Sequence, residues 1–328
     1  MQSHSDKTGM IAKKRLSYRV MAAIGAFLVM MVFVMPNMLY PIFLMKVMCF
    51  ALFACAFNLL IGFAGLLSFG TAAFFGSASY ISAHAAKVWG FPPEFAILAG
   101  TAAAALLGLV IGAISIQRQG IYFAMITLAL SQMIYFLALQ MPFTHGEDGI
   151  QGVPRGVLFG LFDLNDIMTM YYFVLAVFCA GFYLVWRTVH SPFGQTLKAI
   201  RENETRAISL GYKVYYYKLV AFVLYASLAG LAGATKAIVF QLASLTDITW
   251  QMSGEAILMT LLGGMGTLVG PVIGAAIVVT LENYLASTNL PVTVVIGGIF
   301  VVCVLAFRKG IVGELQAAWE RSRNRRDR

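Results

Sequence analysis

A polar island of 32 residues, from Arg187 to Lys218, carries the side chains best suited to binding chemistry. It interrupts a stretch, from Val20 to Phe307, in which charge is otherwise scarce. Its run Arg-Glu-Asn-Glu-Thr-Arg at residues 201–206 places both signs of charge side by side, which suits recognition of a soluble partner. The eight charged residues are Arg187, Lys198, Arg201, Glu202, Glu204, Arg206, Lys213 and Lys218.

Residues that ordinarily do catalytic or metal chemistry are scattered over the chain. The four cysteines fall in apolar segments, and no two of the four histidines have the spacing of metal ligands. The sequence has no G-x-x-x-x-G-K-[ST] phosphate loop, nucleophile elbow or H-E-x-x-H motif. We therefore expect no catalytic residue, no metal site and no cofactor on this chain, and no enzymatic activity of its own.

Three ionisable residues in apolar segments need an account, because each is costly in hydrocarbon. They are Lys236, Glu255 and Glu282, all expected near the outer ends of helices. Snorkelling or mutual pairing explains them without a function. The alternative is a Lys236–Glu255 or Lys236–Glu282 pair that faces a transport cavity.

Glycine is concentrated in residues 62–76 and 263–274. Small residues let helix backbones approach closely, so packing alone explains both stretches. The alternative is a broken helix that lines a transport path, which the short segment Gly254–Gly266 suggests. On that alternative, the path residues are Gly62, Gly65, Ser68, Gly70, Gly263, Gly264, Gly266, Lys236 and Glu255.

The composition places all of these residues in a membrane protein. The chain is 60% hydrophobic and 11% charged, whereas a soluble domain carries about 25% charged residues. Its apolar runs are long and continuous, which favours helices over a β-barrel. We expect an all-α polytopic membrane protein with about ten transmembrane helices. The segments are Arg19–Met35, Pro41–Ile61, Leu66–Ala86, Glu94–Ser115, Gly120–Met141, Met170–Arg187, Lys218–Phe240, Gly254–Gly266, Val269–Ala286 and Val292–Phe307.

The basic residues predict the orientation, because Lys and Arg near helix ends favour the cytoplasm. Ten helices with both termini cytoplasmic place nineteen of the 23 Lys and Arg on that side. The net charge of +9 is then a topology signal that faces anionic lipid, and we expect no nucleic-acid partner. The predicted parts are a cytoplasmic arm (1–18), a transmembrane domain (19–307) and a basic cytoplasmic tail (308–328).

The longest outer loop, residues 142–169, is periplasmic in this arrangement and rich in turn-forming residues. It is either a plain linker or a docking surface for something outside. Composition alone does not separate these alternatives.

The cytoplasmic loop 188–217 has the pattern of two short capped helices. Ser191 is a good N-cap, and Pro192 suits the first helical turn. Asn203 can cap a second helix, Glu204–Leu210, which Gly211 can end.

The first of these helices is amphipathic. Phe193, Leu197 and Ile200 follow at i, i+4 and i+7 and form an apolar stripe. The stripe either lies on the lipid surface or fits into a groove on a soluble partner. The mixed charges of residues 201–206 favour the partner.

Five stretches resemble the M-type permease of the high-affinity branched-chain amino acid ABC importer family. They are spread over nearly the whole chain, and together they are specific for the family. They are FNLLIGFAGLLSFG (57–70), GIYFAMITLALSQM (120–133), SPFGQTLKAIRENETRAISLGY (191–212), LLGGMGTLVGPVIGA (261–275) and FRKGIVG (307–313).

The resemblance implies a type II-like ABC importer permease bundle in the bacterial inner membrane, which imports branched-chain or related amino acids by alternating access. The implied partners are a second homologous permease, two cytoplasmic ATPases that bind ATP and Mg, a periplasmic substrate-binding protein and the lipid bilayer. The glycine-rich outer loop resembles the family's periplasmic segment, which favours docking.

In that family the cytoplasmic loop carries a degenerate form of the E-A-A-x-x-x-G coupling motif. Ala207 and Gly211 match it, whereas the glutamate, if it is Glu204, stands one residue early. The expected ATPase-coupling residues are Phe193, Gly194, Leu197, Lys198, Ile200, Arg201, Glu202, Asn203, Glu204, Ala207 and Gly211.

An ion-coupled secondary transporter of a small solute is the alternative function. It would need ion sites near the membrane midplane, whereas the acids of this chain cluster at helix ends. The sequence leaves open the exact substrate and whether the two permeases of a pair are identical.

Overall fold

The computed structural model describes residues 40–286, 295, 297–298, 301 and 310–314. The chain divides into two units, residues 1–44 and 45–328, and the account below concerns the second. The predicted segments Arg19–Met35 and Val292–Phe307 fall wholly or almost wholly outside the described residues. The ten-helix arrangement and the orientation of the termini therefore stay predictions.

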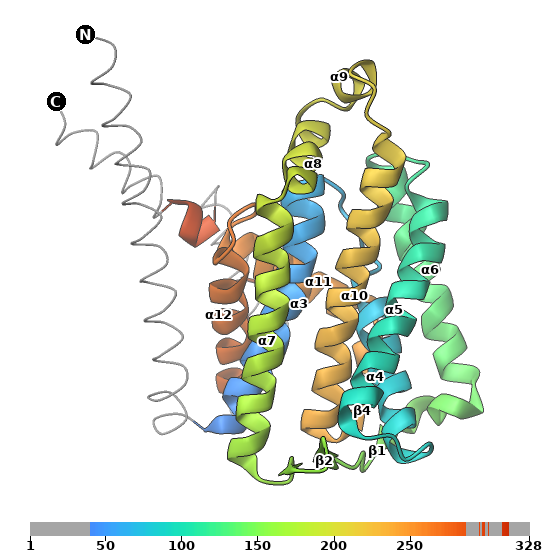
Figure 1. The fold of residues 1–328 in the computed structure, drawn as a ribbon, viewed down its shortest axis with the longest axis vertical. Coiled ribbons are helices and arrows are strands. Elements are labelled where there is room, and N and C mark those ends of the chain that lie inside the picture. Colours follow the sequence, from blue (N-terminus) through green and yellow to red (C-terminus); the bar gives the residue numbers. More distant parts are fainter. Residues whose placement is uncertain (1–39, 287–294, 296, 299–300, 302–309, 315–328) are drawn as a thin grey trace, which may run out of the picture. The chain divides into compact units, whose positions relative to one another are not determined.

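The described chain is mostly helical, as expected (Figure 1). Each of the other eight predicted segments corresponds to a helix. They are α3 (Pro41–Asn58), α4 (Thr71–Lys87), α5 (Pro93–Ser115), α6 (Ile121–Gln140), α7 (Ile167–His190), α10 (Val214–Phe240), α11 (Trp250–Gly263) and α12 (Gly270–Leu285). Among the described residues, five segments are long and apolar enough to cross a membrane, namely α5, α6, α7, α10 and α3 together with the turn that follows it.

Two helix boundaries depart from the prediction in the first glycine stretch. After α3 the helix widens into a π-helical turn, η1 (Leu59–Ala64), which ends at Gly65 in the left-handed conformation (φ 74°). The chain then runs without helix to Gly70, so α4 begins five residues later than predicted. A left-handed residue stops a helix at little cost when it is glycine.

Close packing of small residues holds the centre of the bundle together. Helix α10 packs against α4 and α5, and Gly100 and Gly233 stand at the contacts. A methyl group added at Gly100 would lie 2.6 Å from the carbonyl oxygen of Ala78, so the two backbones touch there. This is the small-residue packing expected between helices in lipid.

The loop 142–169 is folded. It contains the short elements η2 (Pro142–Thr144), η3 (Gly146–Asp148), β1 (Ile150–Gln151), β2 (Val157–Leu158) and β3 (Phe162–Asp163). Strands β2 and β3 form a hairpin, and β1 pairs antiparallel with β4 (Leu242–Ala243) just beyond α10. Arg155 also donates to the carbonyl of Val239 at 2.9 Å, so the loop covers the end of α10.

The end of this loop starts α7 with a charged cap. Asp166 accepts hydrogen bonds from the backbone N–H and the hydroxyl of Thr169, at 3.0 and 2.8 Å. These bonds favour the carboxylate and lower the pKa of Asp166. The cap therefore stays ionised around neutral pH.

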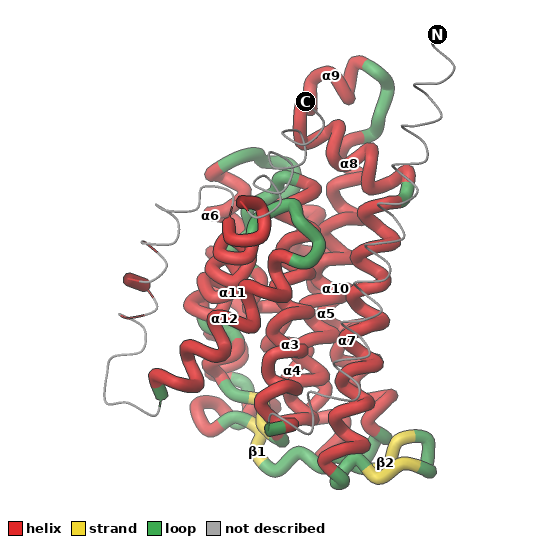
Figure 2. The backbone as a smooth tube through the Cα atoms, turned by 90° about the vertical axis from the view of Figure 1, so that its left-hand side faces the viewer, coloured by secondary structure: helices red, strands yellow, loops and turns green. Residues whose placement is uncertain are grey.

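The polar island forms two helices at the end of the bundle opposite the strands. They are α8 (Pro192–Glu202) and α9 (Glu204–Ser209). Figures 1 and 2 both show them at one end of the bundle, with β1 and β2 at the other end. The molecule thus has one folded polar structure at each end.

Candidate functional site

The predicted caps of the polar island are confirmed. Ser191 accepts a hydrogen bond from the N–H of Gly194 at 3.2 Å and begins α8. Asn203 accepts from the N–H of Arg206 at 2.9 Å and begins α9. Gly211 follows α9 with a φ of 86°, a conformation that other residues rarely adopt. The loop 188–217 therefore has a defined shape.

The apolar stripe of α8 faces the chain itself. Leu197 and Ile200 are 1% and 2% exposed, and Ile200 clusters with Ala207 of α9 and Val214 of α10. The expectation that these two side chains grip a partner is therefore wrong. An amphipathic helix can bury its apolar face on neighbouring helix ends, and here that burial leaves no stripe for a partner.

Phe193 and Gly194 also serve the packing of the loop. The ring of Phe193 stacks on that of Tyr217, with centroids 5.7 Å apart. A methyl group at Gly194 would lie 2.8 Å from the carbonyl carbon of Val189, so the start of α8 sits tightly on the end of α7.

The exposed apolar side chains of this region lie at its tip. Ile208, Leu210, Tyr212 and Tyr216 are all exposed, with Leu210 71% exposed. Beside them an open groove of about 490 Å³ is lined by Gly211, Tyr212, Lys213, Tyr216 and Tyr217. Sequence analysis missed this patch because its residues lie off the i, i+4, i+7 stripe. The signal was the apolar and aromatic run on both sides of Gly211.

Glu204 binds its own chain. Its carboxylate accepts a hydrogen bond from the ammonium of Lys218 at 2.7 Å, and the Lys218 side chain is only 6% exposed. A buried ammonium needs such a partner, because an unpaired charge is costly inside a protein. Glu204 thus connects α9 to the first turns of α10. This gives Glu204 a structural role, which the degenerate coupling motif did not define.

Lys198 and Arg201 connect α8 to the first glycine stretch. Arg201 donates to the carbonyl of Gly62 in η1, and its side-chain stem passes so close to Gly65 that a methyl group there would lie 2.8 Å from Cγ. The ammonium of Lys198 lies 5.4 Å from the centre of the Phe63 ring, within the range of a cation–π contact.

The two glycine stretches meet in space. Asn58, at the end of α3, donates to the carbonyl of Thr267 at 2.7 Å and accepts from the N–H of Gly266 at 2.9 Å. A methyl group at Gly62 would lie 2.8 Å from the nitrogen of Gly266. The sequence marks both stretches by their glycines, and the structure shows that they are neighbours.

The remaining glycine-stretch residues have packing or turn roles. Gly263 packs against Gly270 where α11 meets α12, and Gly264 and Gly266 both have positive φ in the turn between these helices. Ser68 accepts from the N–H of Gly70 at 3.1 Å. These contacts favour close packing, and they leave a role in a transport path as a proposal.

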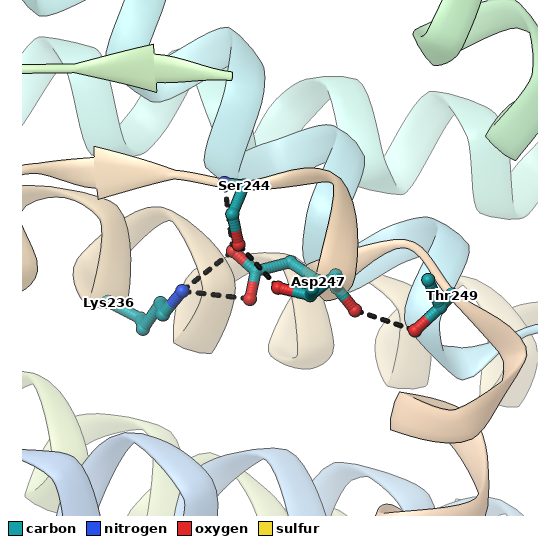
Figure 3. Close-up of polar contacts among 5 residues, drawn as sticks. Lys236, Ser244, Asp247 and Thr249 are labelled. Atoms are coloured by element: carbon teal, nitrogen blue, oxygen red, sulfur yellow. Dashed lines mark hydrogen bonds and ion pairs between the residues drawn. The ribbon is translucent and has the colours of Figure 1, made fainter. Parts of the chain in front are cut away.

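Lys236 pairs with neither Glu255 nor Glu282. Its ammonium binds both carboxylate oxygens of Asp247, at 2.8 and 2.7 Å (Figure 3). Asp247 lies eleven residues on, in the short helix η4 (Leu245–Asp247), where a capping box with Ser244 orients it. The predicted pairs are therefore wrong, because a closer acid is held in place.

Glu282 pairs with another lysine, Lys46 of α3, at 3.4 Å. Glu255 lies in the second turn of α11, whereas Gly263 ends that helix. The predicted path residues therefore form separate groups. Among the described residues, no three His, Cys, Asp or Glu side chains gather as a metal site.

Apolar spanning helices with a folded polar loop at each end define a polytopic helical membrane protein. Residues 40–305 match the family described as branched-chain amino acid transport system, permease component, and the chain belongs to this family. It is a multi-pass protein of the inner membrane, as its relatives and apolar helices indicate. The resemblance found in the sequence is thus confirmed. Transport systems of this ABC type also use ATPase and substrate-binding components.

Two named groups of relatives are similar to the chain. The high-affinity branched-chain amino acid transport system permease protein LivM of Escherichia coli K12 is 24% identical over 288 residues, which is 81% of this chain and 68% of the relative. The ribose import permease protein RbsC of Bacillus subtilis is 29% identical over 189 residues, 55% of this chain and 58% of the relative. No solved structure matches the chain.

Proposed function

We propose that this chain is the M-type permease subunit of an ATP-driven importer. It pairs with a second, homologous permease, the pair binds two cytoplasmic ATPases, to which this chain contributes the tip of loop 188–217, and a periplasmic binding protein delivers the substrate. The partner ATPases hold ATP and Mg and hydrolyse ATP. The chain itself is no enzyme and alternates between two conformations.

The exposed tip of the loop is the observation that carries this proposal. Leu210 and Tyr212 lie beside an open groove at the end of a structure that is packed against the bundle beneath. Exposed apolar and aromatic side chains on a rigid base are typical of protein interfaces. The buried stripe and the Glu204–Lys218 pair supply that base.

The rigid base gives the loop a mechanical function. When the ATPases bind nucleotide and close, a loop fixed to α7 and α10 moves with them and carries these helices along. A flexible loop would absorb the same displacement. The defined caps and the buried core of α8 and α9 therefore support ATP-driven transport over an ion-coupled secondary transporter.

For the cargo we propose branched-chain or related amino acids. The LivM relatives align with 81% of this chain, against 55% for the Bacillus ribose permease. The shared family also contains sugar permeases, so ribose is the competing substrate that an experiment must include.

The folded loop 142–169 is the proposed docking surface for the binding protein. Its β2–β3 hairpin exposes Phe159, Leu161 and Phe162 at the end opposite α8 and α9. The N–H of Phe159 is 3.3 Å from the carboxylate of Glu94 at the start of α5, which fixes the hairpin to the bundle.

Co-purification of the ATPases tests the docking surface. We expect Leu210→Asp to lower the amount of bound ATPase at least tenfold, the size of effect that about 1.4 kcal/mol of lost interface energy produces. Leu161→Asp is the matched control, because it changes another highly exposed leucine at the other end and should leave ATPase binding unchanged. Equal ATPase recovery from both variants would contradict the proposal.

A further inference from the structure

A continuous set of contacts leads from α8 into the transmembrane bundle. It starts at Arg201, which reaches from the last turn of α8 to the carbonyl of Gly62. It continues through Asn58, which is 1% exposed and holds the turn between α11 and α12. Three regions that are far apart in the sequence, namely α8, the junction of α3 and η1, and the α11–α12 turn, are joined here by side-chain-to-backbone bonds.

The first joint lies on the π-helical turn η1. A π turn lacks the regular i to i+4 hydrogen bonds, and such turns occur mostly at functional positions. Arg201 contacts this turn at its Gly62 carbonyl, and Lys198 contacts it at the Phe63 ring. Two cations one turn apart on α8 thus hold the one irregular turn of this span.

The second joint lies between η1 and the α11–α12 turn. Both polar atoms of the Asn58 amide are used, one on the carbonyl of Thr267 and one on the N–H of Gly266. The hydroxyl of Thr267 in turn accepts from the N–H of Gly270, the first residue of α12, at 3.1 Å. A shift of η1 must therefore either move this turn or break two partly buried hydrogen bonds of the buried Asn58, which is costly.

Two glycines allow the Arg201 side chain to lie close to the backbone of η1 and of the α11–α12 turn. Gly65 and Gly266 both have positive φ, and both lie beside the Arg201 side chain. A methyl group added at Gly266 would lie 3.5 Å from the carbonyl oxygen of Gly62 and 3.8 Å from Nη1 of Arg201. A larger residue at Gly65 would displace the Arg201 side chain, whereas at Gly266 it is the positive φ that favours glycine.

We propose that Arg201 and Asn58 are positioning residues that transmit the displacement of α8 to the α11–α12 turn. This inference rests on the proposed function, because it takes the ATPases as the source of the displacement. It goes beyond that function by naming the residues that carry the movement. Arg201 acts on η1, Asn58 passes the shift across to Gly266 and Thr267, and α12 follows.

The test uses the full complex of permeases, ATPases and binding protein in proteoliposomes, and it measures uptake and ATP hydrolysis together. We expect Arg201→Ala to lower the uptake per ATP hydrolysed at least tenfold while the ATPases still co-purify with the permease. Arg201→Lys should recover part of the ratio, because its ammonium can still reach the Gly62 carbonyl. Arg118→Ala, a change of an exposed arginine in the link between α5 and α6, is the control and should leave the ratio unchanged.

A second readout follows the turn itself. Met265, which is 50% exposed in the α11–α12 turn, can be changed to cysteine in a background without the native cysteines and labelled with an environment-sensitive dye. ATP should change the dye signal in the parent complex, and Arg201→Ala or Asn58→Leu should abolish that change. A purely structural role would lower protein yield and leave the ATP response of the surviving complex intact.

Two results would overturn the inference. One is an Arg201→Ala complex with the parent ratio and the parent dye response. The other is loss of the ATPases from the Arg201→Ala complex, which would make Arg201 a docking residue. Failure of the unmodified permease to bind any ATPase would instead contradict the proposed function.

Discussion

Lys218 is the residue whose environment most constrains the polar loop. It is buried at the start of α10, and its only charged partner among the described residues is Glu204 at 2.7 Å. Because the ammonium is almost fully buried beside this carboxylate, the two residues are energetically linked. Glu204 therefore stabilises the loop from inside, whatever contact its exposed edge makes with an ATPase.

Glu204→Gln should lower the free energy of unfolding by on the order of 3 kcal/mol, because it leaves a buried ammonium without its counter-ion. The double variant Glu204→Gln/Lys218→Met should recover most of that loss, since it removes both charges. Thermal unfolding of the detergent-solubilised protein measures both. A double variant that is less stable than Glu204→Gln would contradict the claim that Glu204 stabilises the loop by pairing with the buried ammonium of Lys218.

For single residues, local structure could be predicted from the sequence, whereas long-range side-chain contacts could not. The caps at Ser191 and Asn203 depend on neighbours within three residues, and they were predictable. The partner of Lys236 was not, because a choice among Asp247, Glu255 and Glu282 depends on how α10, η4 and α11 are placed. The burial of Leu197 also depends on the tertiary fold, since an amphipathic stripe does not say which surface covers it.

At the scale of elements, glycines decide which helices pack closely. Gly233 of α10 faces the backbone of Phe75 in α4, where an added methyl group would lie 2.7 Å from the carbonyl carbon. A methyl group added at Gly254 of α11 would have no atom within 4 Å among the described neighbours. Gly233 thus has a packing role, whereas the described contacts show no packing role for Gly254.

Gly233→Ala should sharply reduce the amount of folded protein, because the backbones of α4 and α10 would have to separate. Gly254→Ala is the matched control and should be tolerated, since alanine is about 1 kcal/mol more favourable than glycine within a helix. Size-exclusion chromatography of the solubilised variants measures the folded fraction. Equal profiles for the two variants would show that this contact is not tight.

Helix positions were largely predictable, because long apolar runs and capping residues mark them in the sequence. The exceptions lie in the glycine stretches. The π turn at Leu59–Ala64 and the late start of α4 depend on contacts with Arg201 and with the α11–α12 turn. A sequence pattern does not contain those long-range contacts. The glycines therefore indicated an irregular helix, but not that the irregularity is a π turn or where α4 begins.

For the whole molecule, the positions of the two polar structures predict the topology. The loop 142–169 and the helices α8 and α9 lie at opposite ends of the bundle (Figure 2). The basic residues of the second structure favour the cytoplasm. The hairpin end should then face the periplasm.

Cysteine labelling in spheroplasts tests this topology. A membrane-impermeant thiol reagent should label Leu161→Cys from outside, and it should label Leu210→Cys only after the membrane is permeabilised. Both leucines are highly exposed, so accessibility within the protein is matched. The reverse labelling pattern would invert the proposed direction of the permease.

ATP-driven uptake by the reconstituted complex tests the central claim most directly. Proteoliposomes that contain the permeases and their ATPases, with binding protein outside and ATP inside, should accumulate labelled leucine. Unlabelled isoleucine or valine should compete, and ribose should not. Uptake that follows an imposed ion gradient and needs no ATPase would contradict the account and indicate a secondary transporter.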